Sequence, residues 1–206
     1  IIICGFGSIG KQYLKTIKKY WPKIEISLLR SSSNKKEINK DVKKTFYKIE
    51  EALAWDPDAA IISSPAIYHV EQALSFTKSR IPVLVEKPIG SLNNKSDELE
   101  LLRERSKNSL VLVGYLLRYE PCLELLYGMM KENRIGKILE ADFYCGSWLP
   151  KWREGKEYSQ TVSANSELGG GVLLELSHEI DLAHFLFDDL TILGANLCKS
   201  NILKTD

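Results

Sequence analysis

The order of the apolar runs along this chain constrains its fold more than any other feature. From residue 1 to about residue 118, short stretches rich in β-branched residues alternate with longer stretches whose apolar residues recur at helical spacing. This alternation is typical of β-α units that stack on a parallel sheet. The sequence therefore predicts an α/β fold, with a doubly wound parallel sheet over residues 1–118.

The expected elements can be assigned from the same pattern. The predicted strands cover residues 1–4, 24–29, 45–47, 59–63, 83–86 and 110–114, and the predicted helices between them cover 9–21, 49–54, 68–79 and 95–106. Beyond residue 118 the order changes to a helix at 121–133, a long strand at 138–148, a helix at 172–187 and a strand at 191–197. Residues 119–206 are therefore expected to begin a second domain, of the α+β class with an open sheet.

A glycine-rich turn directly follows the first predicted strand and opens the first predicted helix. It has the pattern GxGxxG and consists of Gly5, Phe6, Gly7, Ser8, Ile9 and Gly10. Such a turn lets the backbone approach a pyrophosphate at a helix N-terminus, which carries partial positive charge. An ordinary strand-helix turn is the alternative, but the strand and helix in register favour dinucleotide binding.

The end of the second predicted strand bears on the choice of cofactor. An acidic residue at this point usually binds the ribose 2′-hydroxyl of NAD, whereas here Arg30 and Ser31 follow the strand. A guanidinium beside hydroxyl groups suits the 2′-phosphate of NADP. NADP is therefore expected, with NAD as the alternative if Arg30 is an ordinary solvated loop residue.

Two further clusters carry groups that could do chemistry. Glu86 and Lys87 close the fifth predicted strand, where strand ends of a doubly wound sheet face the ligand crevice, although a lone lysine there could also be a surface residue. Glu175, His178 and Asp181 recur every three residues, so one helix would present them in a stripe. A helix with a merely polar face is the alternative.

Composition excludes several classes of function. Lys and Arg number 28 against 27 Asp and Glu, so there is no global basic footprint for nucleic acid. No apolar stretch approaches the ~20 residues of a membrane span. Four scattered cysteines and three histidines give no metal-ligand spacing, so no metal is expected and a reduced, cytoplasmic compartment fits best.

Taken together and in order, these motifs resemble those of the Gfo/Idh/MocA oxidoreductases. The motifs are GxGxxG, Ser63-Ser64-Pro65 followed by His69, Glu86-Lys87-Pro88, Gly114-Tyr115 with Arg118 and Pro121, and three glycines leading to His178-Glu179-Ile180-Asp181. The resemblance implies a Rossmann domain joined to an α/β domain with a large open sheet, part of which would lie beyond residue 206. That sheet commonly pairs subunits in the family, so a homo-oligomer is expected.

The resemblance also implies roles for individual residues. Lys87, in a Lys-Pro bond that is often cis, would lie near the nicotinamide and the reacting hydroxyl, and His178 would be the acid/base histidine, with Asp181 at the family's usual step. Glu175 is expected among the substrate-binding residues with Lys87 and His178, although it stands three residues before the histidine instead of the usual four. The remaining cofactor contacts that the resemblance implies are Ser63, Ser64, Pro65, His69, Glu86 and Arg118.

The sequence indicates the substrate less clearly than the cofactor. Trp148, Trp152 and Arg153 follow the long predicted strand, and flat aromatic faces with a cation suit a sugar that carries an acidic group. A loop packed on its own aromatic residues fits equally well. The expected function is hydride transfer between NADP and a sugar, nucleotide sugar or cyclitol. The alternative is a catalytically silent, cofactor-sensing protein on the same fold.

Overall fold

The computed structural model describes residues 1–31, 39–152, 155, 157–198 and 202–203. The chain divides into two compact units. Unit 1 comprises residues 1–114 with 167–169, and unit 2 comprises residues 115–166 with 170–206.

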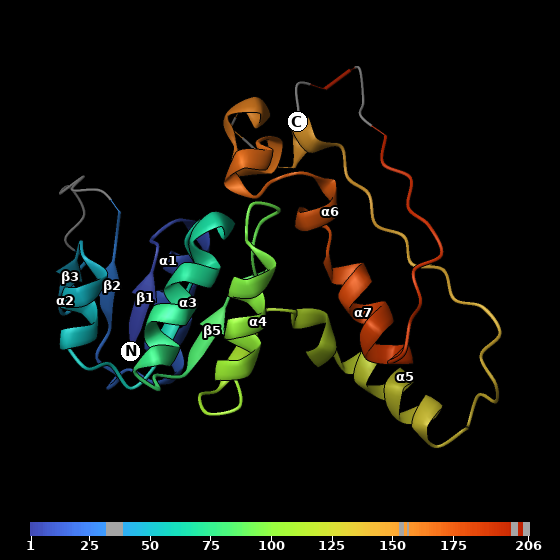
Figure 1. Ribbon diagram of the computed structural model, residues 1–206, viewed down its shortest axis with the longest axis horizontal. Coiled ribbons are helices and arrows are strands. Elements are labelled where there is room, and N and C mark those ends of the chain that lie inside the picture. The colour runs from blue at the N-terminus through green and yellow to red at the C-terminus, as the bar shows by residue number, and fades with distance from the viewer. Residues whose placement is uncertain (32–38, 153–154, 156, 199–201, 204–206) are drawn as a thin grey trace. The chain divides into compact units, whose positions relative to one another are not determined.

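Unit 1 is built on a parallel sheet of six strands in the order β3-β2-β1-β4-β5-β6. Figure 1 labels β3, β2, β1 and β5, which follow one another in this order across the sheet. The strands are β1 (Ile2–Cys4), β2 (Ser27–Leu29), β3 (Thr45–Phe46), β4 (Ala60–Ile62), β5 (Val83–Val85) and β6 (Val111–Val113). The order reverses between β1 and β4, as in a dinucleotide-binding fold. The predicted Rossmann-type α/β fold is confirmed, and each strand is slightly shorter than its predicted range.

The helices of unit 1 follow the strands as expected. They are α1 (Ser8–Tyr20), α2 (Ile49–Ala54), α3 (His69–Lys78) and α4 (Ser96–Arg105), with a short 3-10 turn η1 (Ala66–Tyr68) before α3. Both faces of a parallel sheet are usually buried under the helices that connect its strands, and these helices cover the two faces here.

Alternation along the central strands places successive side chains in two separate cores. Ile2 and Cys4 belong to one apolar cluster, whereas Ile3 between them belongs to the other. Strand β4 repeats the arrangement, since Ile62 packs in the first cluster and Ile61 in the second. Because side chains of a strand point alternately to opposite faces, a continuous apolar run marks a strand that is buried on both.

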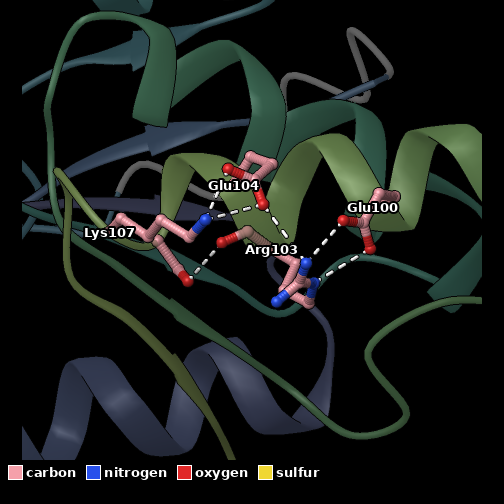
Figure 2. Close-up of polar contacts among 5 residues, drawn as sticks. Glu100, Arg103, Glu104 and Lys107 are labelled. Atoms are coloured by element: carbon pink, nitrogen blue, oxygen red, sulfur yellow. Dashed lines mark hydrogen bonds and ion pairs between the residues drawn. The ribbon is translucent and has the colours of Figure 1, made fainter.

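The outer face of α4 is charged and solvated (Figure 2). Arg103 binds Glu100 and Glu104, and Lys107 binds Glu104, with nitrogen-oxygen distances of 2.6, 3.2 and 2.7 Å. The hydrogen bond from Arg103 holds the pKa of Glu100 below its ordinary value. Exposed pairs of this kind add little to stability, so α4 is positioned by its buried Leu102 instead.

Unit 2 contains helices and short 3-10 turns. The helices are α5 (Pro121–Lys131), α6 (Val172–Glu175) and α7 (His178–Phe187), and the turns are η2 (Leu116–Tyr119), η3 (Leu149–Lys151), η4 (Tyr158–Gln160) and η5 (Val162–Ala164). A further turn, η6 (Ser166–Leu168), spans the boundary between the two units. The prediction of one continuous helix over 172–187 is wrong, because the chain leaves helical geometry at Leu176 and Ser177.

The two strands predicted in unit 2 are also not observed. Within the part of the chain that the structure describes, residues 138–148 and 191–197 form no strand. Their apolar side chains are exposed, with Tyr144 at 93% and Leu193 at 97% of their full surface. A strand needs a neighbouring backbone to satisfy its N–H and C=O groups, and the described residues of unit 2 supply none. No helix in the described ranges is long and apolar enough to cross a membrane.

Candidate functional site

The glycine turn between β1 and α1 forms a cradle at the carboxyl edge of the sheet. Gly5 has a φ of +83°, and a Cβ there would lie 2.7 Å from backbone atoms of Ser63 and Ser64. A Cβ on Gly10 would lie 2.4 Å from the carbonyl oxygen of Gly5, whereas a Cβ on Gly7 would meet nothing within 4 Å. Gly5 and Gly10 therefore make the turn tight, and Gly7 leaves open space beside it. This arrangement fits the pyrophosphate of a dinucleotide at the N-terminus of α1.

The other residues of the turn are arranged around that space. Gly7, Ser8 and Ile9 are exposed, and Phe6 is half-buried. Ser63, at the end of β4, donates its hydroxyl to the carbonyl oxygens of Cys4 at 3.0 Å and Gly5 at 3.2 Å. Ser63 thus braces the turn from the neighbouring strand.

The residues after Ser63 make mainly internal contacts. Ser64 donates its hydroxyl to Oε1 of Gln72 on α3 at 2.7 Å, and Pro65 is exposed. His69 is 1% exposed, and its Nδ1 and Nε2 lie 2.7 and 2.8 Å from the carbonyl oxygens of Pro88 and Ser64. Both ring nitrogens of His69 thus link two loops of the carboxyl edge, and the predicted contact of His69 with a cofactor stays a prediction.

Two cations flank the ring of Phe6. The guanidinium carbon of Arg30 lies 6.0 Å from the ring centroid, and Nζ of Lys11 lies 5.7 Å from it. Arg30 follows β2, its own backbone N–H bound to the carbonyl oxygen of Phe46 at 3.0 Å. Ser31 is exposed. The carboxyl end of β2 therefore carries positive charge beside the glycine turn, where an acidic residue would mark an NAD site.

The carboxyl ends of β5 and β6 hold a second polar group. Tyr13 of α1 donates its hydroxyl to Oε1 of Glu86 at 2.6 Å. Gly114, which follows β6, leaves room for this carboxylate, since a Cβ there would lie 3.3 Å from Oε1. Lys87 comes next and is half-buried, and the Lys87-Pro88 peptide bond is cis, as the resemblance implies.

His178 and Asp181 lie on the first turn of α7 in unit 2. Asp181 has a side chain only 9% exposed, and its two carboxylate oxygens accept hydrogen bonds from Arg118 at 2.8 and 2.6 Å. This hydrogen bonding raises the pKa of Arg118. The guanidinium of Arg118 also lies 5.0 Å from the ring centroid of Phe185. The sequence predicts Arg118 at the cofactor and Asp181 among the catalytic groups; the structure pairs the two side chains, and both roles stay predictions.

The residues around His178 come from the same two segments. Tyr115, just before η2, meets the imidazole edge to face, with ring centroids 5.7 Å apart. Its hydroxyl lies 3.5 Å from the hydroxyl of Ser177, which in turn donates to the carbonyl oxygen of Leu174 at 3.0 Å. Tyr115 and Arg118 are one 3-10 turn apart, and they contact His178 and Asp181, which are one helical turn apart. The segment 115–118 therefore fixes the start of α7 at two points.

Glu175 does not share a helical stripe with His178. It ends α6, and the break at Leu176 and Ser177 separates it from α7. Oε1 of Glu175 accepts a hydrogen bond from the hydroxyl of Ser163 at 3.2 Å. The loop that carries Ser163 packs against the glycine run, since a Cβ on Gly170 would lie 1.9 Å from the carbonyl oxygen of Val162. The predicted stripe of three polar residues is therefore wrong for Glu175.

The predicted substrate residues of unit 2 are only partly described. Trp148 and Trp152 are exposed, at 50% and 40% of their full surface. Arg153 lies outside the described residues, as do Ser32 and Ser33 next to Ser31. Among the side chains that the structure describes, no group of three or more His, Cys, Asp or Glu is arranged to hold a metal ion.

Two contacts and one helix break could not be predicted from the residue pattern. Neither the spacing nor the residue types link Tyr13 to Glu86, or Arg118 to Asp181, because these pairs lie 73 and 63 positions apart in the sequence. The break before His178 had one local signal, Ser177, a residue type that often precedes a helix. This signal was outweighed by the apolar residues of segment 172–187, which recur at helical spacing across the break.

Comparison with known proteins places these features in a family. The family model GFO_IDH_MocA, described as an oxidoreductase family with an NAD-binding Rossmann fold, matches residues 1–115. An uncharacterized oxidoreductase of Synechocystis sp. is 30% identical over 162 residues, which are 76% of this chain and 42% of that protein. An inositol 2-dehydrogenase of Rhodococcus jostii is 26% identical over 136 residues, which are 65% of this chain and 33% of that protein. The chain thus spans less than half the length of these relatives.

Solved structures share the fold. One is the WlbA dehydrogenase of Bordetella pertussis, which was solved with NADH and UDP-GlcNAcA. It matches this chain with a TM-score of 0.70 and 17% sequence identity, over 90% of this chain and 58% of the WlbA chain. Another is the scyllo-inositol dehydrogenase of Lactobacillus casei, which was solved with NAD(H) and scyllo-inositol. It matches this chain with a TM-score of 0.56 and 23% sequence identity, over 66% of this chain and 41% of the dehydrogenase chain.

Proposed function

This chain belongs to the Gfo/Idh/MocA oxidoreductase family, and we propose that the protein transfers a hydride between NADP(H) and a carbon that bears a hydroxyl group in a sugar, nucleotide sugar or cyclitol. The observation that carries the proposal is the match of the family over residues 1–115, together with a glycine cradle that leaves open space beside Gly7. A protein that kept this cradle only for packing would have no need of that space.

The cofactor would be held by the carboxyl edge of unit 1. Backbone N–H groups at the start of α1 would bind the pyrophosphate, and Ser63 keeps the turn in the shape that this requires. Arg30 supports the choice of NADP, because its guanidinium stands where an acidic side chain would repel a 2′-phosphate. Lys11, with its Nζ 5.7 Å from the centroid of the Phe6 ring, adds positive potential.

The nicotinamide supplies hydride chemistry when it is bound, and the protein supplies orientation and proton transfer. Lys87, at the carboxyl end of β5, would hold the substrate oxygen by its positive charge. His178 would accept the hydroxyl proton during oxidation and return it during reduction, since an imidazole with a pKa of about 6.5 titrates close to neutral pH. Tyr115 and the Arg118–Asp181 pair would hold α7 so that the imidazole keeps its orientation.

The proposed substrate class has two supports. The Rhodococcus relative is named for inositol, and the Bordetella structure contains a nucleotide sugar. The exposed rings of Trp148 and Trp152 suit the C–H faces of such rings.

The test is a turnover assay with the full-length protein, NADP(H) or NAD(H), and a panel of sugars, nucleotide sugars and cyclitols. We expect a change in the absorbance of reduced nicotinamide with at least one member of the panel. Binding of cofactor without turnover on any member would replace the proposal with a cofactor-sensing protein.

Cofactor choice is tested by titration of NADPH and NADH into the protein and its Arg30→Ala variant. We expect tighter binding of NADPH, and a loss of roughly tenfold in that preference in the variant, as for one charge-assisted hydrogen bond at a half-exposed site. Lys23→Ala, an exposed lysine before β2, is the matched control and should leave the preference unchanged. Equal binding of both cofactors to the unaltered protein would contradict the choice of NADP.

A further inference from the structure

Three features of unit 1 converge on the carboxylate of Glu86. The hydroxyl of Tyr13 donates to Oε1 at 2.6 Å. The missing side chain of Gly114 leaves the space that the carboxylate occupies, since a Cβ there would lie 3.3 Å from Oε1. The backbone N–H of Glu86 binds the carbonyl oxygen of Ile62 at 2.8 Å, which ties it to β4. Tyr13 and the space at Gly114 thus position the carboxylate, and β4 holds the backbone that carries it.

Tyr13 is suited to hold this carboxylate permanently. Its ring is half-buried against the apolar cluster that contains Ile3, Leu14 and Ile17, so its position is set by packing. Burial, together with the hydrogen bond to Glu86, raises the pKa of the Tyr13 phenol above its ordinary value. The phenol therefore stays neutral and remains a hydrogen-bond donor throughout the physiological pH range.

The strand order assigns Glu86 to one end of the cofactor crevice. In a sheet of order 3-2-1-4-5-6 the dinucleotide lies across the carboxyl ends of the strands, with its pyrophosphate at the first glycine turn and its adenosine ribose at the end of the second strand. The other nucleotide must then lie toward β4 and β5. Glu86 follows β5 and Arg30 follows β2, so an anion stands next to the cation Lys87 at the nicotinamide end, whereas Arg30 supplies a cation at the adenosine end.

This distribution of charge bears on the redox state of the cofactor. The oxidised nicotinamide ring carries a positive charge and the reduced ring carries none, so a fixed carboxylate nearby attracts only the oxidised form. We propose that Tyr13 is a positioning residue that fixes the Glu86 carboxylate at the nicotinamide end of the crevice, and thereby strengthens binding of oxidised over reduced cofactor. This inference rests on the proposed function, because it requires a nicotinamide cofactor at this edge.

The experiment compares dissociation constants for oxidised and reduced cofactor in the full-length protein and in Tyr13→Phe, which removes one hydroxyl and keeps the ring. We expect the dissociation constant of the oxidised cofactor to rise about three- to tenfold, which is less than the largest effects seen on loss of a hydrogen bond to a charged group. The dissociation constant of the reduced cofactor should change by less than about twofold. Tyr20→Phe, at the exposed end of the same helix, is the matched control and should change neither constant.

Glu86→Gln shows whether the effect passes through the carboxylate. It should weaken oxidised cofactor at least as much as Tyr13→Phe, and Tyr13→Phe should add nothing when introduced into Glu86→Gln. A loss of equal size for both redox forms in Tyr13→Phe would mean that the hydroxyl only supports the fold, and would overturn the inference. An unchanged ratio in a protein that binds both forms overturns the inference alone, whereas a protein that binds neither form overturns the proposed function as well.

Discussion

Unit 1 and unit 2 carry similar apolar patterns but satisfy them differently. In unit 1 the strand residues Ile2 and Ile62 are fully buried, and every strand pairs with a parallel neighbour. In unit 2 the extended segments at 138–148 and 191–197 find no strand partner among the described residues, and Leu193 is 97% exposed. An apolar pattern therefore indicates that a segment can form a strand, but the segment becomes one only when a neighbouring strand pairs with it.

The comparison also extends to the polar groups. In unit 1 the hydroxyl of Ser63 is held by main chain of a neighbouring strand, and Glu86 is held by main chain of β4 and by the side chain of Tyr13. The polar groups of unit 2 are held by side chains, with Arg118 on Asp181 and Ser163 on Glu175. We expect the geometry of unit 1 to tolerate surface substitutions well, and that of unit 2 to depend on a few pairs.

The largest expected effect breaks the core of unit 1. Phe76 on α3 is 0% exposed, and Phe76→Ala should lower the free energy of unfolding by about 3–5 kcal/mol, because it removes a buried ring and leaves a cavity. Leu125→Ala, at a 62% exposed position on α5, should change it by less than about 0.5 kcal/mol. Urea unfolding followed by circular dichroism measures both. Equal losses would show that α5 is buried in solution and that the contrast between the units is smaller than described.

The next prediction separates the chemistry of unit 1 from its fold. Lys87→Ala should lower turnover at least about a hundredfold on an identified substrate, because the lysine would hold the substrate oxygen in the transition state. Its unfolding midpoint should match that of the unaltered protein. Lys78→Ala, at the exposed end of α3, is the control and should keep full turnover. Near-normal turnover in Lys87→Ala would remove the lysine from the proposed mechanism.

A smaller effect is expected where unit 2 depends on a single pair. Asp181→Asn weakens the double hydrogen bond with Arg118, and because Arg118 is 37% exposed, the loss should be about 1 kcal/mol of unfolding free energy. Turnover should fall as well, since α7 carries His178. A double-mutant cycle with Arg118→Lys measures the coupling between the two residues. Strict additivity of the two substitutions would mean that the pair does not hold α7.

The smallest effect is expected on the solvated face of α4 in unit 1. Arg103→Ala removes the ion pairs of Arg103 with Glu100 and Glu104 in Figure 2 and should shift the unfolding midpoint less than Phe76→Ala or Asp181→Asn, because exposed ion pairs are screened by water. The pKa of Glu100 is lowered in the folded protein, so the pair stabilises the fold above the ordinary pKa of a glutamate. That contribution is lost as the pH falls through the lowered pKa. A difference between Arg103→Ala and the unaltered protein that grew on acidification would contradict this sign.

The sequence by itself determined the Rossmann-type sheet, the glycine cradle and the helices α1 to α5. Continuous apolar runs specify strands buried on both faces, and helices close their hydrogen bonds within one segment, so both signals are local. Within unit 2, α5 and α7 form as their patterns predict, even though the single helix predicted over 172–187 is interrupted at Ser177.

Only the tertiary structure decided which polar groups meet and which extended segments pair. Tyr13 reaches Glu86 because residues of α1 and Leu84 of β5 belong to one apolar cluster, and Arg118 reaches Asp181 because η2 contacts α7. Such contacts join residues that are far apart in the sequence, and no periodicity encodes them. The segments at 138–148 and 191–197 show the same limit, because the hydrogen bonds of a strand are completed by another part of a chain.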